Sequence, residues 1–444
     1  MVVIKPFRAV RYNPQRIPEM HTVVSQPYDK IDERLRDEYL ALSPYNIVRI
    51  ILNPSQPGDV PPGPNVYTRA RDYYQQWLRE GILIREDRPA FYVYRQTFTA
   101  NDQTYTRQGL IAAVELVDFN QGVILPHERT HSGPKEDRLR LLETVQANTE
   151  QIFLLYPDPA NTVDQIIAQA IAARPPDIDA VEFQEHGVRQ QLWVLTSPDT
   201  LAAIQAAMAP MRQLIIADGH HRYSTGLIYR DQQRRAHPDA PPEAAFNFVQ
   251  ATLVSMSDPG LVVLPTHREV CNFNDTPPAE VLRRAMPFFT VTAVRDLETC
   301  LQGINSHPSG HAFGFYGGRS VGFHVLALKD ATQLDSLIPE PYSPAWKSLA
   351  VSVVHKVLIE RIAGVPTQGI ENQTMIRYHR DAHAAVANID AGRGNFAFFV
   401  TPTRLEQIKT IATQGETMPQ KSTDFYPKVI SGLTILPVAP EERL

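Results

Sequence analysis

Short apolar runs that alternate with helical patterns dominate this sequence, and this alternation limits the possible folds most strongly. In the clearest example, LIIA from Leu214 predicts a buried strand, Asp218 and Gly219 predict a sharp turn, and the residues that follow predict a helix. Residues 46–52 (NIVRIIL) also predict a strand, and residues 67–81 predict a helix. Strands and helices that alternate in this way are typical of α/β or α+β proteins. We therefore expect a multi-lobed fold of mixed sheets with helices.

The chain has 444 residues, which is more than one ordinary hydrophobic core organises. Proline-rich stretches at 237–245 and 272–280 are the best candidates for surface connections. The sequence therefore predicts an N-terminal α/β lobe (1–125), a central lobe (126–270) and a C-terminal α/β lobe (271–444).

Composition excludes several classes of protein. The formal net charge of −5 argues against a dedicated nucleic-acid binder. Cys271 and Cys300 are the two cysteines, so the chain has neither a disulfide framework nor a cysteine-based zinc site. The first residues lack the apolar core of a signal peptide, and no apolar run approaches the length of a membrane span. We expect a cytoplasmic protein that acts on a small molecule, and the sequence leaves its oligomeric state open.

Residues 127–131 (HERTH) match H-E-x-x-H, the pattern of zinc proteases. Those enzymes need both histidines on one helical face. Here a proline precedes the motif and Ser-Gly-Pro follows it, which leaves barely one helical turn, so we reject a zinc protease. The loop is either a solvated polar loop or a site, because loops at strand ends often carry the chemistry of α/β proteins. As a site it offers the catalytic candidates His127 and Glu128 and the phosphate-binding candidates Arg129, Lys135 and Arg138.

The DGHHR run at 218–222 carries the most chemistry. A helix that begins at a sharp turn directs backbone N–H groups and its positive dipole end at a ligand above the strand end. Gly219, His220, His221 and Arg222 are therefore candidate phosphate contacts. Asp218 is placed to hold Mg²⁺ or to take a proton from an attacking hydroxyl. The alternative is that Asp218 only caps the helix.

Residues 415–428 (GETMPQKSTDFYPK) come close to the P-loop pattern, but Gln420 replaces its second glycine and the preceding segment looks helical. We therefore do not predict a P-loop. The segment is either a polar loop before the last strand or a source of side-chain donors for a phosphate. Those donors are Lys421, Ser422, Thr423 and Lys428.

Several motifs resemble those of a known family. PFRAVRY, QPYD, GVILPHERT, GPKEDRL, IADGHHRY, LPTHR, MPQKST and FYPK are similar to motifs of the domain-of-unknown-function family 1015, up to residue 428. His131 is not part of that pattern. The DGHHR turn also resembles the phosphate-facing motif of the ParB and sulfiredoxin superfamily, which includes nucleotide-binding proteins and free-serine kinases. This second resemblance implies a ParB/sulfiredoxin-like unit around the turn, in which Asp218 is the acidic residue and 219–222 contact phosphate.

These features predict a nucleotide-dependent phosphotransferase for a small hydroxy compound, with free L-serine as the best guess. Phosphoryl transfer needs positioning and charge neutralisation, which the basic residues and carboxylates would supply. The expected cofactors are a nucleotide (ATP, ADP or CTP) and Mg²⁺ held by Asp218 and Glu128. A metal-dependent phosphatase or other hydrolase and a non-catalytic nucleotide-binding protein stay open as alternatives.

Overall fold

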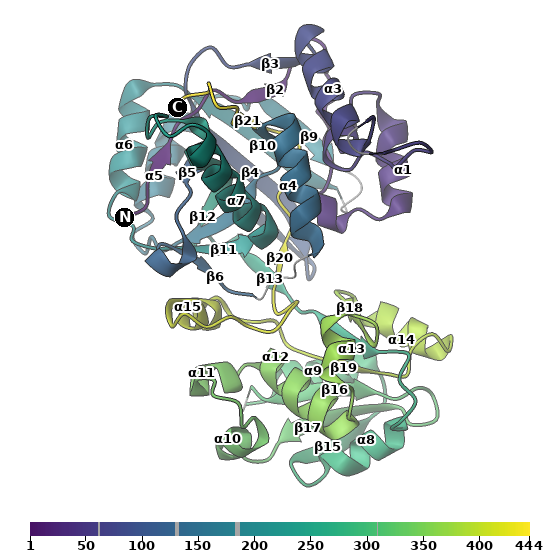
Figure 1. Cartoon of the computed structure of the whole chain (residues 1–444). Helices are drawn as coiled ribbons and strands as arrows, with labels where there is room; N and C mark the ends of the chain where they lie inside the picture. Colours follow the sequence, from purple (N-terminus) through teal and green to yellow (C-terminus); the bar gives the residue numbers. More distant parts are fainter. Residues whose placement is uncertain (61–62, 129–132, 183–186, 309) are drawn as a thin grey trace. The chain divides into compact units, whose positions relative to one another are not determined.

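The computed structural model describes residues 1–60, 63–128, 133–182, 187–308 and 310–444. The chain forms two compact units. Unit 1 comprises Met1–Pro126, Thr130–Val262 and Pro427–Leu444, and unit 2 comprises His127–Arg129 and Val263–Tyr426. Each unit combines a sheet with helices, which confirms the predicted α/β class (Figure 1). No helix in the described residues has both the length and the apolar character needed to cross a bilayer.

A mixed sheet forms the centre of unit 1, with nine strands in the described residues. The strand order is β6-β11-β8-β12-β5-β4-β10-β9, and β1 pairs with β5. β11 runs parallel to β6 and β12 parallel to β8, whereas the other neighbours are antiparallel. The strands are β1 (Ile4–Lys5), β4 (Phe91–Ala100), β5 (Gln103–Glu115), β6 (Ile124–Pro126), β8 (Ile152–Tyr156), β9 (Ile178–Glu182), β10 (Val188–Leu195), β11 (Leu214–Asp218) and β12 (Phe248–Ser255).

The long β4–β5 hairpin joins the two sides of this sheet. Its turn residues, Asn101 and Asp102, have φ values of +48° and +58°, a conformation that Asn and Asp tolerate better than most residues. β4 pairs with β10, and β5 pairs with β12. Residues of the predicted N-terminal and central lobes therefore share one sheet.

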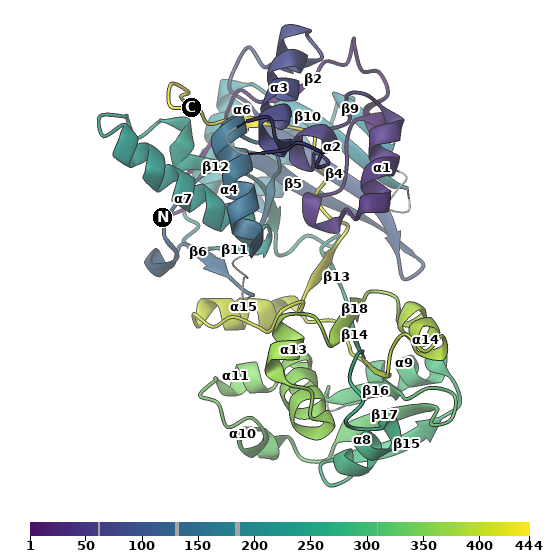
Figure 2. The same ribbon diagram turned by 45° about the vertical axis from the view of Figure 1, so that its right-hand side comes forward.

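Helices cover the sheet of unit 1, and α4 lies beside both α7 and α3 (Figures 1 and 2). The helices are α1 (Glu33–Leu42), α2 (Val48–Ile51), α3 (Val66–Arg79), α4 (Gly133–Val145), α5 (Thr162–Ile171), α6 (Pro198–Met208) and α7 (His220–Ala236). The strand predicted at 46–52 is wrong, because this segment contains α2. The Asn46 side chain starts that helix by accepting a hydrogen bond from the Val48 N–H at 3.0 Å, and an apolar run this short fits a buried helix as well as a strand.

The last segment of the chain, Pro427–Leu444, belongs to unit 1. Ser431 and Ser25 exchange backbone hydrogen bonds, and the Ile435 N–H donates to the Val10 carbonyl at 2.8 Å. Two short ribbons accompany this segment: β21 (Leu436–Pro437) pairs with β7 (Ala147–Asn148), and β2 (Val10–Tyr12) pairs with β3 (Leu83–Arg85). The return of the chain places Lys428 in unit 1.

Unit 2 is built on an antiparallel sheet with the order β15-β17-β16-β19-β14-β18. Its strands are β14 (His267–Val270), β15 (Phe289–Val294), β16 (Ala312–Tyr316), β17 (Phe323–Leu328), β18 (Ile376–His379) and β19 (Phe396–Phe399), and β13 (Val262–Leu264) pairs with β20 (Asp424–Tyr426). Its helices are α8 (Pro278–Ala285), α9 (Leu297–Asn305), α10 (Leu334–Leu337), α11 (Pro344–Lys347), α12 (Ala350–Ser352), α13 (Thr367–Glu371), α14 (Ala382–Asp390) and α15 (Leu405–Thr413).

A π-helix, η6 (Val353–Ala363), continues α12 in unit 2. The sequence predicts a helix over 351–364. The structure confirms a helix there, and most of it is wound as a π-helix. Gly364, with φ of +83°, ends the element. π-Helices are rare, mostly a single turn long, and frequent at functional sites.

Candidate functional site

The DGHHR turn connects the end of β11 to the first residue of α7 in unit 1. Gly219 has a φ of +91°, which glycine adopts without strain. A Cβ on Gly219 would lie 3.3 Å from the Arg222 guanidinium and from the Cα of Ile152. α7 begins at His220 with Gly219 as its N-cap and no side-chain cap. The predicted alternative, that Asp218 caps the helix, is therefore wrong.

Two basic side chains hold the carboxylate of Asp218. Lys428 Nζ donates to Oδ1 at 3.2 Å and Arg222 Nη2 donates to Oδ2 at 2.5 Å, and these lysine and arginine side chains are only 6% and 10% exposed. Burial would raise the pKa of Asp218, but the charges of Lys428, Arg222 and Lys30 outweigh it and hold that pKa well below its usual range. Asp218 is therefore a permanent anion, poorly suited to take a proton.

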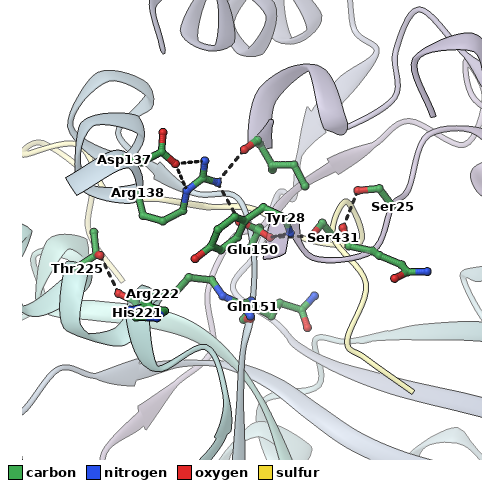
Figure 3. A network of polar contacts seen from close by, with 12 residues as sticks. Ser25, Tyr28, Asp137, Arg138, Glu150, Gln151, His221, Arg222, Thr225 and Ser431 are labelled. Carbon is green, nitrogen blue, oxygen red and sulfur yellow. Dashed lines mark hydrogen bonds and ion pairs between the residues drawn. The ribbon is translucent and has the colours of Figure 1, made fainter. Parts of the chain in front are cut away.

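A second polar network in unit 1 surrounds Arg138 and Glu150 (Figure 3). The Arg138 guanidinium lies 4.1 Å from the ring centroid of Tyr28, and its Nη1 lies 3.6 Å from Oε2 of Glu150. Oε1 of Glu150 accepts from the Tyr28 N–H at 3.0 Å and from Ser431 Oγ at 3.3 Å. Arg222 reaches the same region, because its Nη1 donates to the carbonyl of Gln151. The motifs QPYD, GPKEDRL and DGHHR thus meet in one place.

A pocket in unit 1 opens beside this network. Its empty space, counted together with the open solvent at its mouth, is about 410 Å³. Two guanidinium groups and one carboxylate give its wall both signs of charge. The lining residues are Arg138, Leu141, Leu142, Ala147, Asn148, Thr149, Glu150, Arg222, Thr225 and Val249.

The predicted phosphate contacts divide between the two units. Those in unit 1 are Gly219, His220, His221 and Arg222 at the turn, Lys428 on the carboxylate of Asp218, and Lys135 and Arg138 on α4. Lys135 is half-buried. Arg129 lies outside the described residues. Lys421, Ser422 and Thr423 belong to unit 2.

In unit 2, His127 and Glu128 hold the MPQKST segment. Oε1 of Glu128 accepts from the N–H and from Oγ1 of Thr423, both at 2.8 Å, and Nε2 of His127 lies 2.7 Å from the same hydroxyl. The Met418 N–H donates to the His127 carbonyl at 2.8 Å. Neither His127 nor Glu128 lies in a helix, which agrees with the rejection of a zinc protease, and His131 lies outside the described residues.

The rest of this segment is also anchored within unit 2. Ser422 Oγ donates to the Pro419 carbonyl at 2.6 Å, and the Ser422 carbonyl accepts from Thr403 Oγ1 at 2.7 Å. Lys421 is exposed and has a φ of +52°. The element before the segment is the helix α15, so the strand that a P-loop needs does not precede it, as expected.

The described donor groups do not suit a protein-held Mg²⁺. Both oxygens of Asp218 already accept from cations, and Oε1 of Glu128 accepts twice from Thr423. No group of three or more His, Cys, Asp or Glu side chains in the described residues could hold a metal ion. Mg²⁺ selects oxygen ligands in near-octahedral geometry, and the attached lysine and arginine would compete with it for Asp218. We therefore derive no step through a metal held by Asp218 and Glu128.

Sequence reasoning missed Tyr28, Lys30 and Glu150 as members of the site. Tyr28 carried a signal, because it belongs to the QPYD motif, but the motif alone gave it no role. Glu150 carried no signal, since NTEQ at 148–151 reads as ordinary polar residues before a strand.

Comparison with protein families gives one match. The chain matches the family described as "Protein of unknown function (DUF1015)" over residues 4–352. No curated protein sequence matches the chain.

Three solved structures that match the chain are distantly similar to it. A free serine kinase in complex with AMP is 12% identical with a TM-score of 0.36, over 76% of this chain and 93% of the kinase. A conserved hypothetical protein from Pyrococcus furiosus is 12% identical with a TM-score of 0.34, over 73% of this chain and 95% of that protein. SbnI from Staphylococcus aureus, with a C-terminal truncation, is 10% identical with a TM-score of 0.36, over 74% of this chain and 87% of SbnI. Similarity this low does not assign a function.

Proposed function

We propose that this chain, which belongs to the DUF1015 family of proteins of unknown function, is a nucleotide-dependent phosphotransferase that acts on a small hydroxy compound. The observation that carries the proposal is the placement of Arg222 and Lys428 on Asp218 at the start of α7. A helix N-terminus favours anions, and phosphate recognition needs N–H donors and cations in fixed positions. A carboxylate that stays ionised fixes both cations before the ligand arrives, which is the preorganisation that phosphoryl transfer requires.

The roles follow from the reaction. The bond between phosphorus and the leaving oxygen of the nucleotide breaks, the acceptor hydroxyl oxygen bonds to phosphorus, and the hydroxyl loses its proton. Arg222, Lys428 and the backbone of the turn neutralise the phosphate charge. Asp218 is a positioning residue, because its low pKa makes it a poor proton acceptor. The sequence-based candidates for the proton acceptor, His127 and Glu128, belong to unit 2 and stay a prediction.

The pocket beside the Arg138–Glu150 network is the proposed acceptor site in unit 1. Its guanidinium groups and carboxylate match the two charges of an amino acid. Together with the resemblance of the DGHHR turn to a superfamily that includes free-serine kinases, this makes free L-serine the first acceptor to test.

The experiment measures binding first and turnover second. A ligand that binds only the native state raises its unfolding temperature, so ATP, ADP and CTP are screened for thermal stabilisation. L-Serine is then incubated with and without the stabilising nucleotide, and we expect a phosphorylated product only when the nucleotide is present. Phosphate release from a phosphomonoester without nucleotide would favour a hydrolase, and nucleotide binding without turnover of any hydroxy compound would favour a binding protein.

A further inference from the structure

A second pocket lies wholly within unit 2. Its empty space, counted together with the open solvent at its mouth, is about 510 Å³. It includes Gln420 of the MPQKST segment, which the proposed phosphate site in unit 1 does not use. The lining residues that carry the argument are Tyr342, Trp346, His355, Glu371, Tyr378 and Gln420.

One wall of this pocket is the half-buried ring of Tyr342, which stacks on the buried indole of Trp346. The rings of Tyr342 and Trp346 stack with centroids 3.8 Å apart and planes 15° apart. Trp346 Nε1 donates to the Thr417 carbonyl at 3.0 Å, and the Trp346 N–H donates to Ser343 Oγ at 3.1 Å, so both the indole and its backbone are fixed. A fixed aromatic face favours a planar ring as its partner.

A second wall is polar and positively charged. Arg268 is fully buried, and its Nε donates to Nε2 of His355 at 3.2 Å. Because Nε2 accepts, the neutral imidazole carries its proton on Nδ1. Burial, then the charges of Arg268 and Lys356, hold the pKa of His355 well below its usual range, so the ring stays neutral. The guanidinium also lies 5.6 Å from the ring centroid of Tyr378.

The hydroxyl of Tyr378 is the unsatisfied group in this wall. It is buried and makes no hydrogen bond with the residues that the structure describes. Native proteins pair nearly all such groups, because a buried hydroxyl without a partner lowers stability. An acceptor atom of a ligand in the pocket would satisfy it.

The carboxylate available to a ligand is that of Glu371, one of the lining residues. The other charged lining groups are engaged with one another, since Lys356 Nζ contacts Glu360 at 2.8 Å and Glu340 at 3.2 Å. Glu371 is exposed and belongs to α13. Its carboxylate can accept a hydrogen bond from an amino group of a ligand in the pocket.

The backbone around the pocket is unusual in two places. His355 and Lys356 are supplied by the π-helix η6, and Gln420 precedes Lys421, a non-glycine residue with a φ of +52°. π-Helices and left-handed non-glycine residues are both costly conformations that concentrate at functional sites. They support a ligand site in unit 2 independently of the lining chemistry.

We infer that this pocket binds a planar nitrogen heterocycle that carries an amino group, as adenine does. The ligand ring packs on Tyr342, which stacks on Trp346. A ring nitrogen accepts from the Tyr378 hydroxyl, and the amino group donates to Glu371. A compact ammonium ion fits less well, because Arg268 keeps its positive charge behind the tyrosine: burial lowers the pKa of this arginine only to about 10.

The test uses the full chain and adenosine, which lacks phosphate and so does not probe the contacts proposed for Arg222 and Lys428. Adenosine should quench tryptophan fluorescence saturably. Trp346→Phe should abolish this quenching, because the other two tryptophans, Trp77 and Trp193, belong to unit 1. Tyr378→Phe removes only the hydroxyl and should weaken adenosine binding about two- to tenfold, the effect of one hydrogen bond. Glu371→Gln, on an exposed residue, should weaken it similarly.

The matched control is Tyr105→Phe, which deletes a tyrosine hydroxyl on β5 of unit 1 and should leave adenosine affinity unchanged. Circular dichroism confirms that each variant is folded. The inference is overturned if adenosine and adenine fail to bind at millimolar concentration. It is also overturned if choline, which represents a compact ammonium ion, quenches the tryptophan fluorescence and adenosine does not, or if neither Tyr378→Phe nor Glu371→Gln changes the affinity for adenosine.

Discussion

Lys428→Met is the sharpest test of the phosphate site, because it removes one charge and keeps an unbranched side chain that is only one atom shorter. Lys428 Nζ lies 3.2 Å from Oδ1 of Asp218. Coulomb's law with an effective dielectric constant of about 20 gives about 5 kcal/mol of attraction at that distance. Desolvation of the buried lysine offsets most of it, and Arg222 still pairs with the same carboxylate. We therefore expect a net loss of about 1–3 kcal/mol in the free energy of unfolding.

The substitution should also weaken nucleotide binding. A charged hydrogen bond to a phosphate contributes about 1.5–3 kcal/mol, so the dissociation constant of the bound nucleotide should rise about 10- to 150-fold. Calorimetric titration measures that constant at two salt concentrations, and urea unfolding measures stability. The variant should also show a weaker dependence of affinity on salt, because one cation that pairs with phosphate is gone.

The matched control is Lys409→Met, which removes the same charge from an exposed residue of α15 in unit 2. It should leave both nucleotide affinity and stability within about 0.5 kcal/mol of the wild type. If Lys428→Met binds the nucleotide as tightly as this control, the contact between Lys428 and Asp218 is purely structural, and the phosphate site loses its main support.

Three further predictions test other parts of the chain. Arg138→Met should lower the free energy of unfolding by about 3 kcal/mol, because it removes the guanidinium that pairs with the buried carboxylate of Glu150. Urea denaturation checks this, and a loss below about 1 kcal/mol contradicts it. Burial first, and then the charge of Asp258, raises the pKa of Asp164 to about 6. Ionisation of Asp164 in the folded protein therefore lowers the free energy of unfolding as the pH rises from about 4 to about 7. Asp164→Asn should flatten that decline when urea unfolding is measured across this pH range, and parallel pH profiles of variant and wild type would refute the prediction. His131→Ala should keep wild-type activity, and elemental analysis should find no stoichiometric zinc in either protein.

Local pattern predicted the part of the site that is continuous in sequence. The apolar run before Asp218, the glycine and the polar helix start determine a strand, a turn and a helix within a few residues of one another. The β4–β5 hairpin was predictable for the same reason, since Asn101 and Asp102 supply the turn conformation. Residues 46–52 show the limit of this reasoning, because periodicity in a short apolar run does not separate a strand from a helix.

The contacts that give the site its charge could not be predicted, because they join distant segments. Lys428 and Asp218 are 210 residues apart in sequence, and Glu150 and Tyr28 are 122 apart. Such pairs depend on tertiary contacts, here on the return of the C-terminal segment to unit 1 and its pairing with Ser25 and Val10. The sequence motifs do not show that these residues lie close together; only the three-dimensional fold does.

Asp218 shows why residue type alone does not determine a chemical role. A carboxylate at a strand tip suggests a base or a metal ligand, and both roles require an oxygen that a proton or a metal can reach. In this chain Lys428 and Arg222 each contact one of its oxygens, and their charges depress its pKa. The same contacts that make Asp218 a poor base fix two cations at a helix N-terminus. The chemistry of the turn is therefore carried by the cations, and the carboxylate acts through them.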